Sequence, residues 1–291
     1  MAHTDQQEVA AQSGNFKIGG DLEVNRLGFG SMRLTGEGIW GEPEDPAECR
    51  RVLERAVEQG VNFIDTADSY GPDVAERLIA EALHPYRDDL VIATKAGLTR
   101  SGPNEWEPNG RPEHIRQACE GSLKRLKLER IDLYQLHRID RNVPVEESLG
   151  AMTELQSEGK IRHIGLSEVT VEQLEHAQGI TAIISVQNRF NLADRSAEDV
   201  LEVCERDGLG FIPWFPLETG SLAGAGGPLA EAAERHGSAP AQLALAWLLH
   251  RSPVVLPIPG TSSVEHLEEN LAAAAIELSD DEVRELEQAA D

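Results

Sequence analysis

Four side chains suited to acid–base chemistry lie at the ends of short apolar runs. Asp65 and Tyr70 belong to D-T-A-D-S-Y, Lys95 to A-T-K-A-G, and His137 to Y-Q-L-H. A phenol with a pKa of about 10 is a weak acid at neutral pH, and a nearby ammonium held by a carboxylate would favour its ionised form. An imidazole beside it could hydrogen-bond the same substrate oxygen. Such a group suits a carbonyl oxygen that gains negative charge, as hydride addition requires.

Each of these residues also has an ordinary structural interpretation. Asp65 and Lys95 could form a buried ion pair, Tyr70 could be a packed aromatic residue, and His137 could be a hydrogen-bonded core histidine. Their occurrence at consecutive strand ends favours one shared site. That interpretation requires a fold in which consecutive strand ends meet.

The order of elements predicts such a fold. Apolar strand-like runs alternate with segments of helical periodicity and short connections, which is typical of one parallel (β/α)8 TIM barrel of the α/β class. The runs are Leu27–Gly30, Val61–Asp65, Leu90–Lys95, Ile131–His137, Ile161–Ser167, Ala182–Gln187, Leu209–Trp214 and Val254–Pro257. A doubly wound sheet is the alternative, but G-F-G-S-M-R-L lacks the glycine spacing of a dinucleotide-binding turn.

The regions around the barrel are also predictable. Residues 1–14 are expected to be a flexible tail and residues 15–291 a single barrel domain, which begins with a hairpin over Phe16–Val24. Gly97–Arg111 and Phe215–Gly227 are longer than the connections need to be, so we expect lids at the catalytic face.

The composition limits the partners of the chain. It has 51 acidic and 26 basic residues and a net charge of −25, which argues against nucleic acid and anionic membranes as partners. This acidity fits salt adaptation or merely a solvated acidic surface. The three cysteines have no metal-type spacing, and no apolar run could span a bilayer. We expect a cytoplasmic monomer or weak oligomer without a metal site.

From L-G-F-G-S-M at 27–32 to I-P-G-T-S-S-V-E-H-L-E-E-N-L at 258–271, the chain resembles the aldo-keto reductase family, in particular its short bacterial oxidoreductases. The resemblance implies that Asp65, Tyr70, Lys95 and His137 form the catalytic tetrad. It also implies NAD(P)H-dependent reduction of aldehydes and ketones to alcohols, with Tyr70 as the general acid. The partner is then a small carbonyl substrate.

The resemblance further implies cofactor contacts. Ser167 and Gln187 would hold the nicotinamide carboxamide, and Trp214 would stack on the ring. The other matching positions are Pro216, Leu217, Gly260, Thr261, Ser262, Ser263, His266, Glu269 and Asn270. NADP(H) is the expected cofactor and NAD(H) is possible, because the adenosine segment lacks the arginine that best holds a 2′-phosphate.

Two departures affect this site. Glu168 stands where the family usually has asparagine, and Phe215 stands where a small serine is common. The substrate pocket is expected to include Trp40, Trp106 and Arg138, and to suit small or aromatic aldehydes, with Arg138 able to meet an anionic group. Because the chain ends soon after its last helix, the pocket should be open and permissive.

Two other functions are compatible with these residues. Lys95 could form a Schiff base, as in an aldolase, although pairing with Asp65 would keep it protonated and weakly nucleophilic. The chain could also be a slow-turnover regulatory subunit that binds the cofactor, as some family members are.

Overall fold

The computed structural model describes residues 8–217 and 227–290. Seven parallel strands form one sheet, and each strand is paired with the next along the chain. They are β3 (Phe29–Gly30), β4 (Phe63–Asp65), β5 (Val91–Ala96), β8 (Ile131–Leu136), β9 (Ile161–Ser167), β10 (Ile183–Gln187) and β11 (Gly210–Phe211). Sequential pairing of this kind brings all the carboxyl ends to one rim.

The segment 254–259 closes the sheet into a barrel. On one side, Phe211 N donates to Val254 O at 2.9 Å and Leu256 N donates to Phe211 O at 2.8 Å. On the other side, Gly28 N donates to Pro257 O at 2.9 Å. Proline has no N–H to donate, so this segment cannot form a continuous ladder. The predicted (β/α)8 barrel is confirmed, with an eighth strand reduced to isolated contacts.

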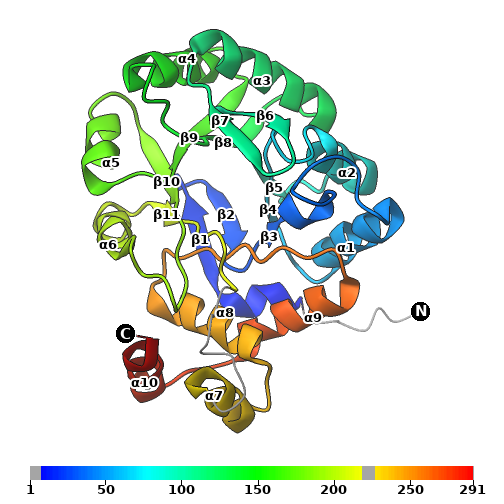
Figure 1. The fold of residues 1–291 in the computed structure, drawn as a ribbon, viewed down its shortest axis with the longest axis vertical. Helices are drawn as coiled ribbons and strands as arrows, with labels where there is room; N and C mark the ends of the chain where they lie inside the picture. The colour runs from blue at the N-terminus through cyan, green and yellow to red at the C-terminus, as the bar shows by residue number, and fades with distance from the viewer. Residues whose placement is uncertain (1–7, 218–226, 291) are drawn as a thin grey trace.

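Helices surround the strands on the outside, as Figure 1 shows. They are α1 (Pro46–Glu58), α2 (Val74–Leu83), α3 (Pro112–Leu126), α4 (Val145–Ser157), α5 (Val171–Gln178), α6 (Glu198–Asp207), α8 (Pro240–Arg251) and α9 (Val264–Ala272). α1 shows why they form: Cys49, Val52 and Ala56 recur at helical spacing and are buried. Asp45 caps that helix by accepting from Glu48 N.

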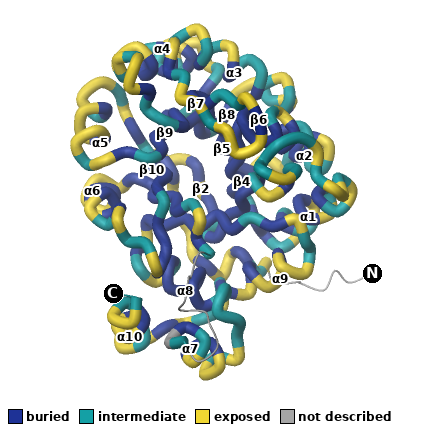
Figure 2. Tube along the Cα trace, viewed as in Figure 1, coloured by how far each residue is buried: buried dark blue, intermediate teal, exposed yellow. Residues whose placement is uncertain are grey.

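Two further helices lie outside this ring, beside α8 (Figure 1). They are α7 (Pro228–His236) and α10 (Asp280–Ala290), and the His236 ring is hydrogen-bonded to Glu282 at 2.8 Å. Figure 2 shows burial concentrated on the strands and on the inner faces of the helices. All six residues of β5 are buried, as expected of a parallel strand covered on both faces.

The amino-terminal segment covers the barrel end opposite the site. β1 (Asn15–Ile18) and β2 (Leu22–Asn25) form the predicted hairpin, whose Gly19 and Gly20 have φ of 62° and 83°. Ile18 and Val24 pack in one cluster with barrel residues such as Phe63. Ahead of the hairpin, η1 (Val9–Ser13) lies within the expected tail and is ordered because Ser13 Oγ accepts from Leu27 N at 3.0 Å.

The two long connections differ in what the structure describes. Within 97–111, β6 (Leu98–Gly102) and β7 (Glu105–Pro108) form an antiparallel hairpin, so this connection has regular structure. Most of the second connection, 218–226, lies outside the described residues. Short 3-10 turns occur at η2 (Ser31–Leu34) and η4 (Ala273–Ala275). In the described part of the chain, no helix has the length and apolarity to cross a membrane.

Candidate active site at the barrel mouth

The parallel strands place the four predicted catalytic residues at one rim. Asp65 ends β4, Lys95 is the penultimate residue of β5, and His137 directly follows β8. Tyr70 lies in the connection between β4 and α2. His137 N donates to Ala96 O at 2.7 Å, so the hydrogen bonding between β5 and β8 continues to His137 and fixes its backbone. All four residues are buried.

Lys95 links the carboxylate to the phenol. Its Nζ donates to Asp65 Oδ1 at 2.5 Å, to Thr66 O at 2.8 Å and to Tyr70 OH at 3.3 Å. The three donor hydrogens of this fully buried ammonium therefore all have acceptors. The predicted contact between the ammonium and the phenol is present.

The second oxygen of Asp65 accepts hydrogen bonds from two glutamine side chains. Gln135 Nε2 donates to Asp65 Oδ2 at 3.1 Å, and Gln187 Nε2 donates to the same oxygen at 2.8 Å. The sequence analysis did not single out Gln135, although its place two residues before His137 in Y-Q-L-H puts it on the same strand. Asp65 thus connects Lys95 to a residue expected to bind the cofactor.

Burial outweighs the ammonium in setting the acidity of Tyr70. Burial raises the pKa of the phenol and Lys95 offsets this only in part, so the pKa stays above its ordinary value. We had expected Lys95 to bring the pKa of Tyr70 towards neutrality, but burial of the phenol penalises the charged phenolate by more than the ammonium favours it. Burial also opposes the charge of Lys95, yet Asp65 and then Tyr70 outweigh it and raise the pKa of the ammonium.

His137 is a neutral hydrogen-bonding group. Burial, followed by the charges of Lys95, Arg138 and Arg100, lowers its pKa well below the ordinary value. Its ring lies 5.9 Å from that of Tyr70, centroid to centroid, at an angle of 79°. Its Nδ1 lies 3.4 Å from Ser69 Oγ, which leaves Nε2 for another partner. A neutral imidazole beside the phenol fits the predicted role of hydrogen bonding.

Two adjoining cavities meet at Tyr70. One has a volume of about 210 Å³ and extends to Gly260 and Leu217; the other has about 400 Å³ and extends to Trp106 and Arg138. The residues that line both are Met32, Tyr70, Gln187, Trp214 and Phe215. The phenol therefore lies where two molecules in neighbouring cavities would meet.

Several of the residues predicted to bind the cofactor line the smaller cavity. Its walls include Gln187, Trp214, Pro216, Leu217 and Gly260. The exposed Arg33 of η2 also lines it, and sequence reasoning missed this cation. Its position three residues after Gly30 in G-F-G-S-M-R was the available signal.

The resemblance places the adenosine end of the cofactor at residues 259–263 with His266, Glu269 and Asn270; apart from Gly260, which lines the smaller cavity, these residues are absent from the walls of both cavities and lie around the start of α9. Ser263 caps this helix by accepting from His266 N at 3.4 Å, and Thr261 Oγ1 accepts from Ser263 N at 3.1 Å. Glu48 Oε1 accepts from Val264 N at 3.2 Å, so a carboxylate of α1 lies at the positive end of α9. The remaining predicted positions there are Ser262, Glu269 and Asn270.

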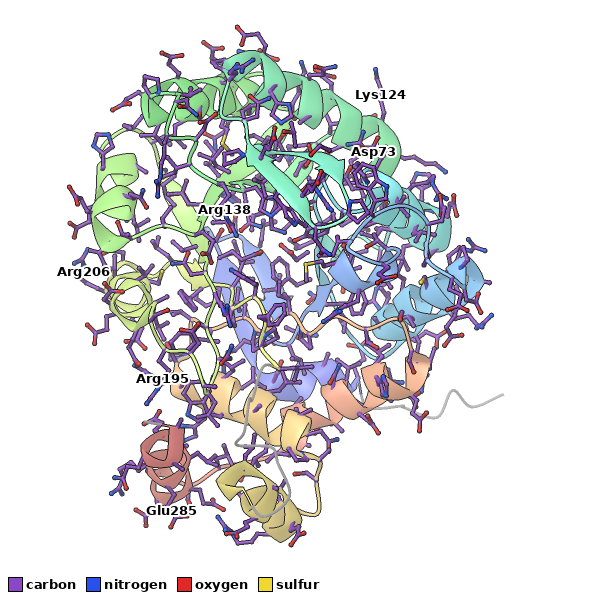
Figure 3. The ribbon with its side chains drawn as sticks, in the orientation of Figure 1. Asp73, Lys124, Arg138, Arg195, Arg206 and Glu285 are labelled. Carbon is purple, nitrogen blue, oxygen red and sulfur yellow. The ribbon has the colours of Figure 1, made fainter. Side chains whose placement is uncertain are left out.

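The larger cavity contains most of the expected substrate residues. Trp106 and Arg138 line it. Ser167, which was expected to hold the nicotinamide carboxamide, also lines this cavity and not the smaller one, and its Oγ accepts from Arg138 Nη1 at 3.1 Å. Figure 3 shows Arg138 over the centre of the barrel, well inside the helices that carry Arg206 and Glu285. Trp40 is absent from the walls of this cavity; its ring lies 5.6 Å from the guanidinium of Arg100.

Arg100 organises the wall of this cavity. Its guanidinium lies 3.6 Å from the ring centroid of Trp106 and donates to Ile39 O at 2.8 Å and Ser69 O at 3.0 Å. It also donates to the carbonyl groups of Gly38, Gly102 and Glu105. One side chain thus joins the β6–β7 hairpin to the segment that carries Tyr70.

The sequence that folds into this barrel matches a known family. The family model described as "Aldo/keto reductase family" matches residues 26–291. The chain belongs to the aldo/keto reductase family. Members with similar sequences include an uncharacterized oxidoreductase of Schizosaccharomyces pombe, 52% identical over 96% of this chain and 90% of that protein. The pyridoxine 4-dehydrogenase of Escherichia coli is 42% identical over 90% of this chain and 93% of its own.

Solved structures of aldo/keto reductases have the same fold. An aldo-keto reductase from Klebsiella pneumoniae in complex with NADPH superposes with a TM-score of 0.80 at 29% identity, covering 94% of each chain. A glycerol dehydrogenase from Gluconobacter oxydans gives a TM-score of 0.85 at 25% identity, covering 95% of each chain.

Proposed function

We propose that this chain reduces small aldehydes and ketones to alcohols with NADPH, and that Tyr70 is the general acid. The observation that carries the proposal is the position of the Tyr70 hydroxyl, which is hydrogen-bonded to Lys95 at the junction of two cavities. The related NADPH complex from Klebsiella pneumoniae supports the choice of cofactor.

The smaller cavity fits the nicotinamide end of such a cofactor. Gln187 donates its amide N–H to Asp65, which leaves Oε1 as an acceptor for a carboxamide. Trp214 offers an aromatic surface, and Arg33 places a cation where the cavity opens. When bound, reduced nicotinamide would supply hydride to the carbonyl carbon.

Residues of the chain donate a proton and a hydrogen bond to the carbonyl oxygen of the substrate. As the carbonyl carbon gains hydride, the π electrons move to oxygen, and the Tyr70 hydroxyl gives that oxygen its proton. Lys95 then stabilises the phenolate, while Asp65 keeps Lys95 charged. His137 hydrogen-bonds the same oxygen. Because burial keeps the pKa of Tyr70 above its ordinary value, the hydroxyl carries its proton at neutral pH.

The contacts of Lys95 disfavour a Schiff-base reaction. All three hydrogens of its ammonium are used, and its pKa is raised by Asp65 and Tyr70 over the opposing effect of burial. A neutral amine is needed to attack a carbonyl. Trapping of a lysine–substrate adduct by borohydride would contradict this assignment.

The relative from Escherichia coli suggests which substrate to test first. Pyridoxine 4-dehydrogenase, by its name, acts at carbon 4 of pyridoxine, and oxidation of that alcohol gives an aromatic aldehyde. The larger cavity here offers Trp106 and Trp214 for an aromatic ring and Arg138 for a polar or anionic substituent. We therefore include pyridoxal in the substrate class.

The test is NADPH oxidation with pyridoxal and a panel of other aldehydes. We expect turnover by the wild type and a loss of about 10²–10⁴-fold in kcat for Tyr70→Phe, which keeps the ring but removes the proton. Unchanged NADPH affinity would show that the variant retains its fold. Full activity of Tyr70→Phe would refute the mechanism, and cofactor binding without turnover of any aldehyde would favour a regulatory role.

A further inference from the structure

Glu168 has an unusual backbone and a specific set of contacts. It directly follows β9 with φ of 56°, a left-handed conformation that is uncommon for residues other than glycine, asparagine and aspartate. Its Oε1 accepts from Arg189 N at 2.7 Å and from Trp214 Nε1 at 2.5 Å. Hydrogen bonds to a carboxylate are stronger than neutral ones, so these contacts offset the cost of the backbone.

These contacts tie three consecutive strand ends together. Glu168 N donates to Gln187 O at 3.0 Å, and Trp214 N donates to Asn188 O at 3.1 Å. Asn188 Oδ1 in turn accepts from Val169 N at 3.1 Å. The backbone at Glu168 and Val169 is therefore fixed by hydrogen bonds to Gln187 and Asn188. The Glu168 carboxylate in turn gives the Trp214 indole N–H a fixed acceptor.

Glu168 is not among the residues that line the two cavities of Trp214. It lines a separate groove with Thr170, Asn188 and Arg189. It acts on the site through the Trp214 indole, through the backbone of Gln187, and through its charge, which opposes the lowering of the Arg138 pKa by burial. The other contacts of the indole are less directional: the Arg189 guanidinium lies 5.9 Å from its centroid, and the exposed Phe215 packs edge-on at 5.5 Å.

We infer that Glu168 is a positioning residue that fixes the orientation of Trp214 between the two cavities. The inference rests on the proposed function, in which the nicotinamide lies against this indole. Without the carboxylate, rotation about the side-chain torsions would let the indole enter either cavity, since it lines both. Cofactor binding would then have to order it, at a cost in affinity.

Three substitutions of Glu168 distinguish the effects of side-chain length, of negative charge and of backbone strain. Glu168→Gln keeps the length and an oxygen acceptor. Glu168→Asn suits the left-handed backbone better but is one methylene too short to reach the indole. Glu168→Ala removes the acceptor altogether. Glu172→Ala is the matched control, because Glu172 is an exposed carboxylate in the first turn of α5.

The first measurement needs no cofactor. In ¹⁵N–¹H spectra of the full chain, the Trp214 indole signal is identified by its loss in Trp214→Phe. We expect this signal to move upfield in Glu168→Ala and Glu168→Asn, to stay closer to its original position in Glu168→Gln, and to be unchanged in Glu172→Ala. An unchanged signal in Glu168→Ala would overturn the inference, whatever the enzyme activity.

The second measurement is the Kd for NADPH. Glu168→Ala and Glu168→Asn should raise it about tenfold, which corresponds to about 1.4 kcal/mol, whereas Glu168→Gln should raise it less than about threefold. In a Trp214→Phe background the same substitutions should have little further effect. Equal losses in both backgrounds would contradict a role through the indole. Failure of the wild type to bind NADPH would instead refute the proposed function, and the indole signal would still decide the position of Trp214.

Discussion

Replacing Asp65 by asparagine tests whether the tetrad rests on a buried charge pair. The side chains of Lys95 and Asp65 are 0% and 2% exposed, and their charged atoms lie 2.5 Å apart. Asparagine keeps the shape and an oxygen acceptor but removes the negative charge, so the ammonium is left with neutral partners only: the new amide oxygen, Thr66 O and the Tyr70 hydroxyl. Breaking a buried ion pair by removing one partner costs about 3–5 kcal/mol, because the remaining charge stays desolvated.

This cost should be visible in unfolding experiments. For a chain of 291 residues the unfolding entropy is about 0.6 kcal/mol/K, so about 3–5 kcal/mol corresponds to a fall in Tm of about 5–8 °C. Asp89→Asn is the matched control, since Asp89 forms an exposed ion pair with Arg87 at 2.8 Å. An exposed pair contributes less than about 1 kcal/mol. The comparison separates the loss of a buried partner from the loss of any aspartate.

The pH dependence of this loss of stability shows whether the charge of Lys95 causes it. In the wild type, the folded-state pKa of Lys95 is raised, so its stabilising contribution is complete at neutral pH and is lost only as the pH rises through that value. In Asp65→Asn, burial without a partner should depress the folded-state pKa below the ordinary 10.5. The unfolded chain then binds more protons, so the variant should gain stability as the pH rises towards the ordinary value.

The assay is denaturant unfolding of both proteins at about pH 7 and about pH 9.5, a window below the ordinary lysine pKa. We expect the free-energy difference between wild type and variant to shrink at the higher pH. A difference below about 1 kcal/mol, or one of several kcal/mol that does not change with pH, would refute the buried-charge argument.

Two further predictions concern the edges of the site. Glu48→Gln removes the charge that lies against Val264 N at the start of α9, so the ratio of kcat/KM for NADPH over NADH should rise about two- to fivefold, because a carboxylate there disfavours a 2′-phosphate. Initial rates with both cofactors measure this ratio, and a fall would contradict the placement of the adenosine end at α9. Arg100→Lys cannot satisfy the carbonyl groups that the guanidinium joins, so stability should fall by about 1–3 kcal/mol. The KM for aldehyde should rise more than kcat falls, because Trp106 loses its stacking partner; steady-state kinetics and thermal unfolding test this, and an unchanged KM would mean that Trp106 does not depend on Arg100.

The sequence predicted the barrel well because each strand is a local apolar run followed by a helix with its own buried face. The span Ile161–Ser167 was predicted at both ends, since Gly159 precedes it and polar residues follow it. The last strand was harder to predict, because proline interrupts its ladder. Its contacts with Phe211 and Gly28 depend on neighbours far away in the chain.

The candidate site was predictable where motifs carry the chemistry and less so where distant residues meet. Gln135, Arg33 and Arg100 were missed because their importance depends on contacts between distant segments. Gln135 and Arg33 lie within motifs that were singled out, but a place in a motif does not show which residues a side chain will contact. The acidity of Tyr70 was misjudged for a related reason. The sequence shows that Lys95 is near, but the degree of burial that opposes it is a property of the packed structure.

The amide of Gln187 has a consequence for the stereochemistry of the reaction. Asp65 can only accept hydrogen bonds, so it fixes which end of that amide is N–H and which is oxygen. A nicotinamide carboxamide beside Gln187 would therefore meet the side-chain oxygen of Gln187. Rotation of the Gln187 amide by half a turn would break its hydrogen bond to Asp65. If the ring turned over, its own amide would no longer present N–H groups to that oxygen. In the proposed complex, the same carboxylate that keeps Lys95 charged would thus favour one prochiral face of the nicotinamide for hydride transfer.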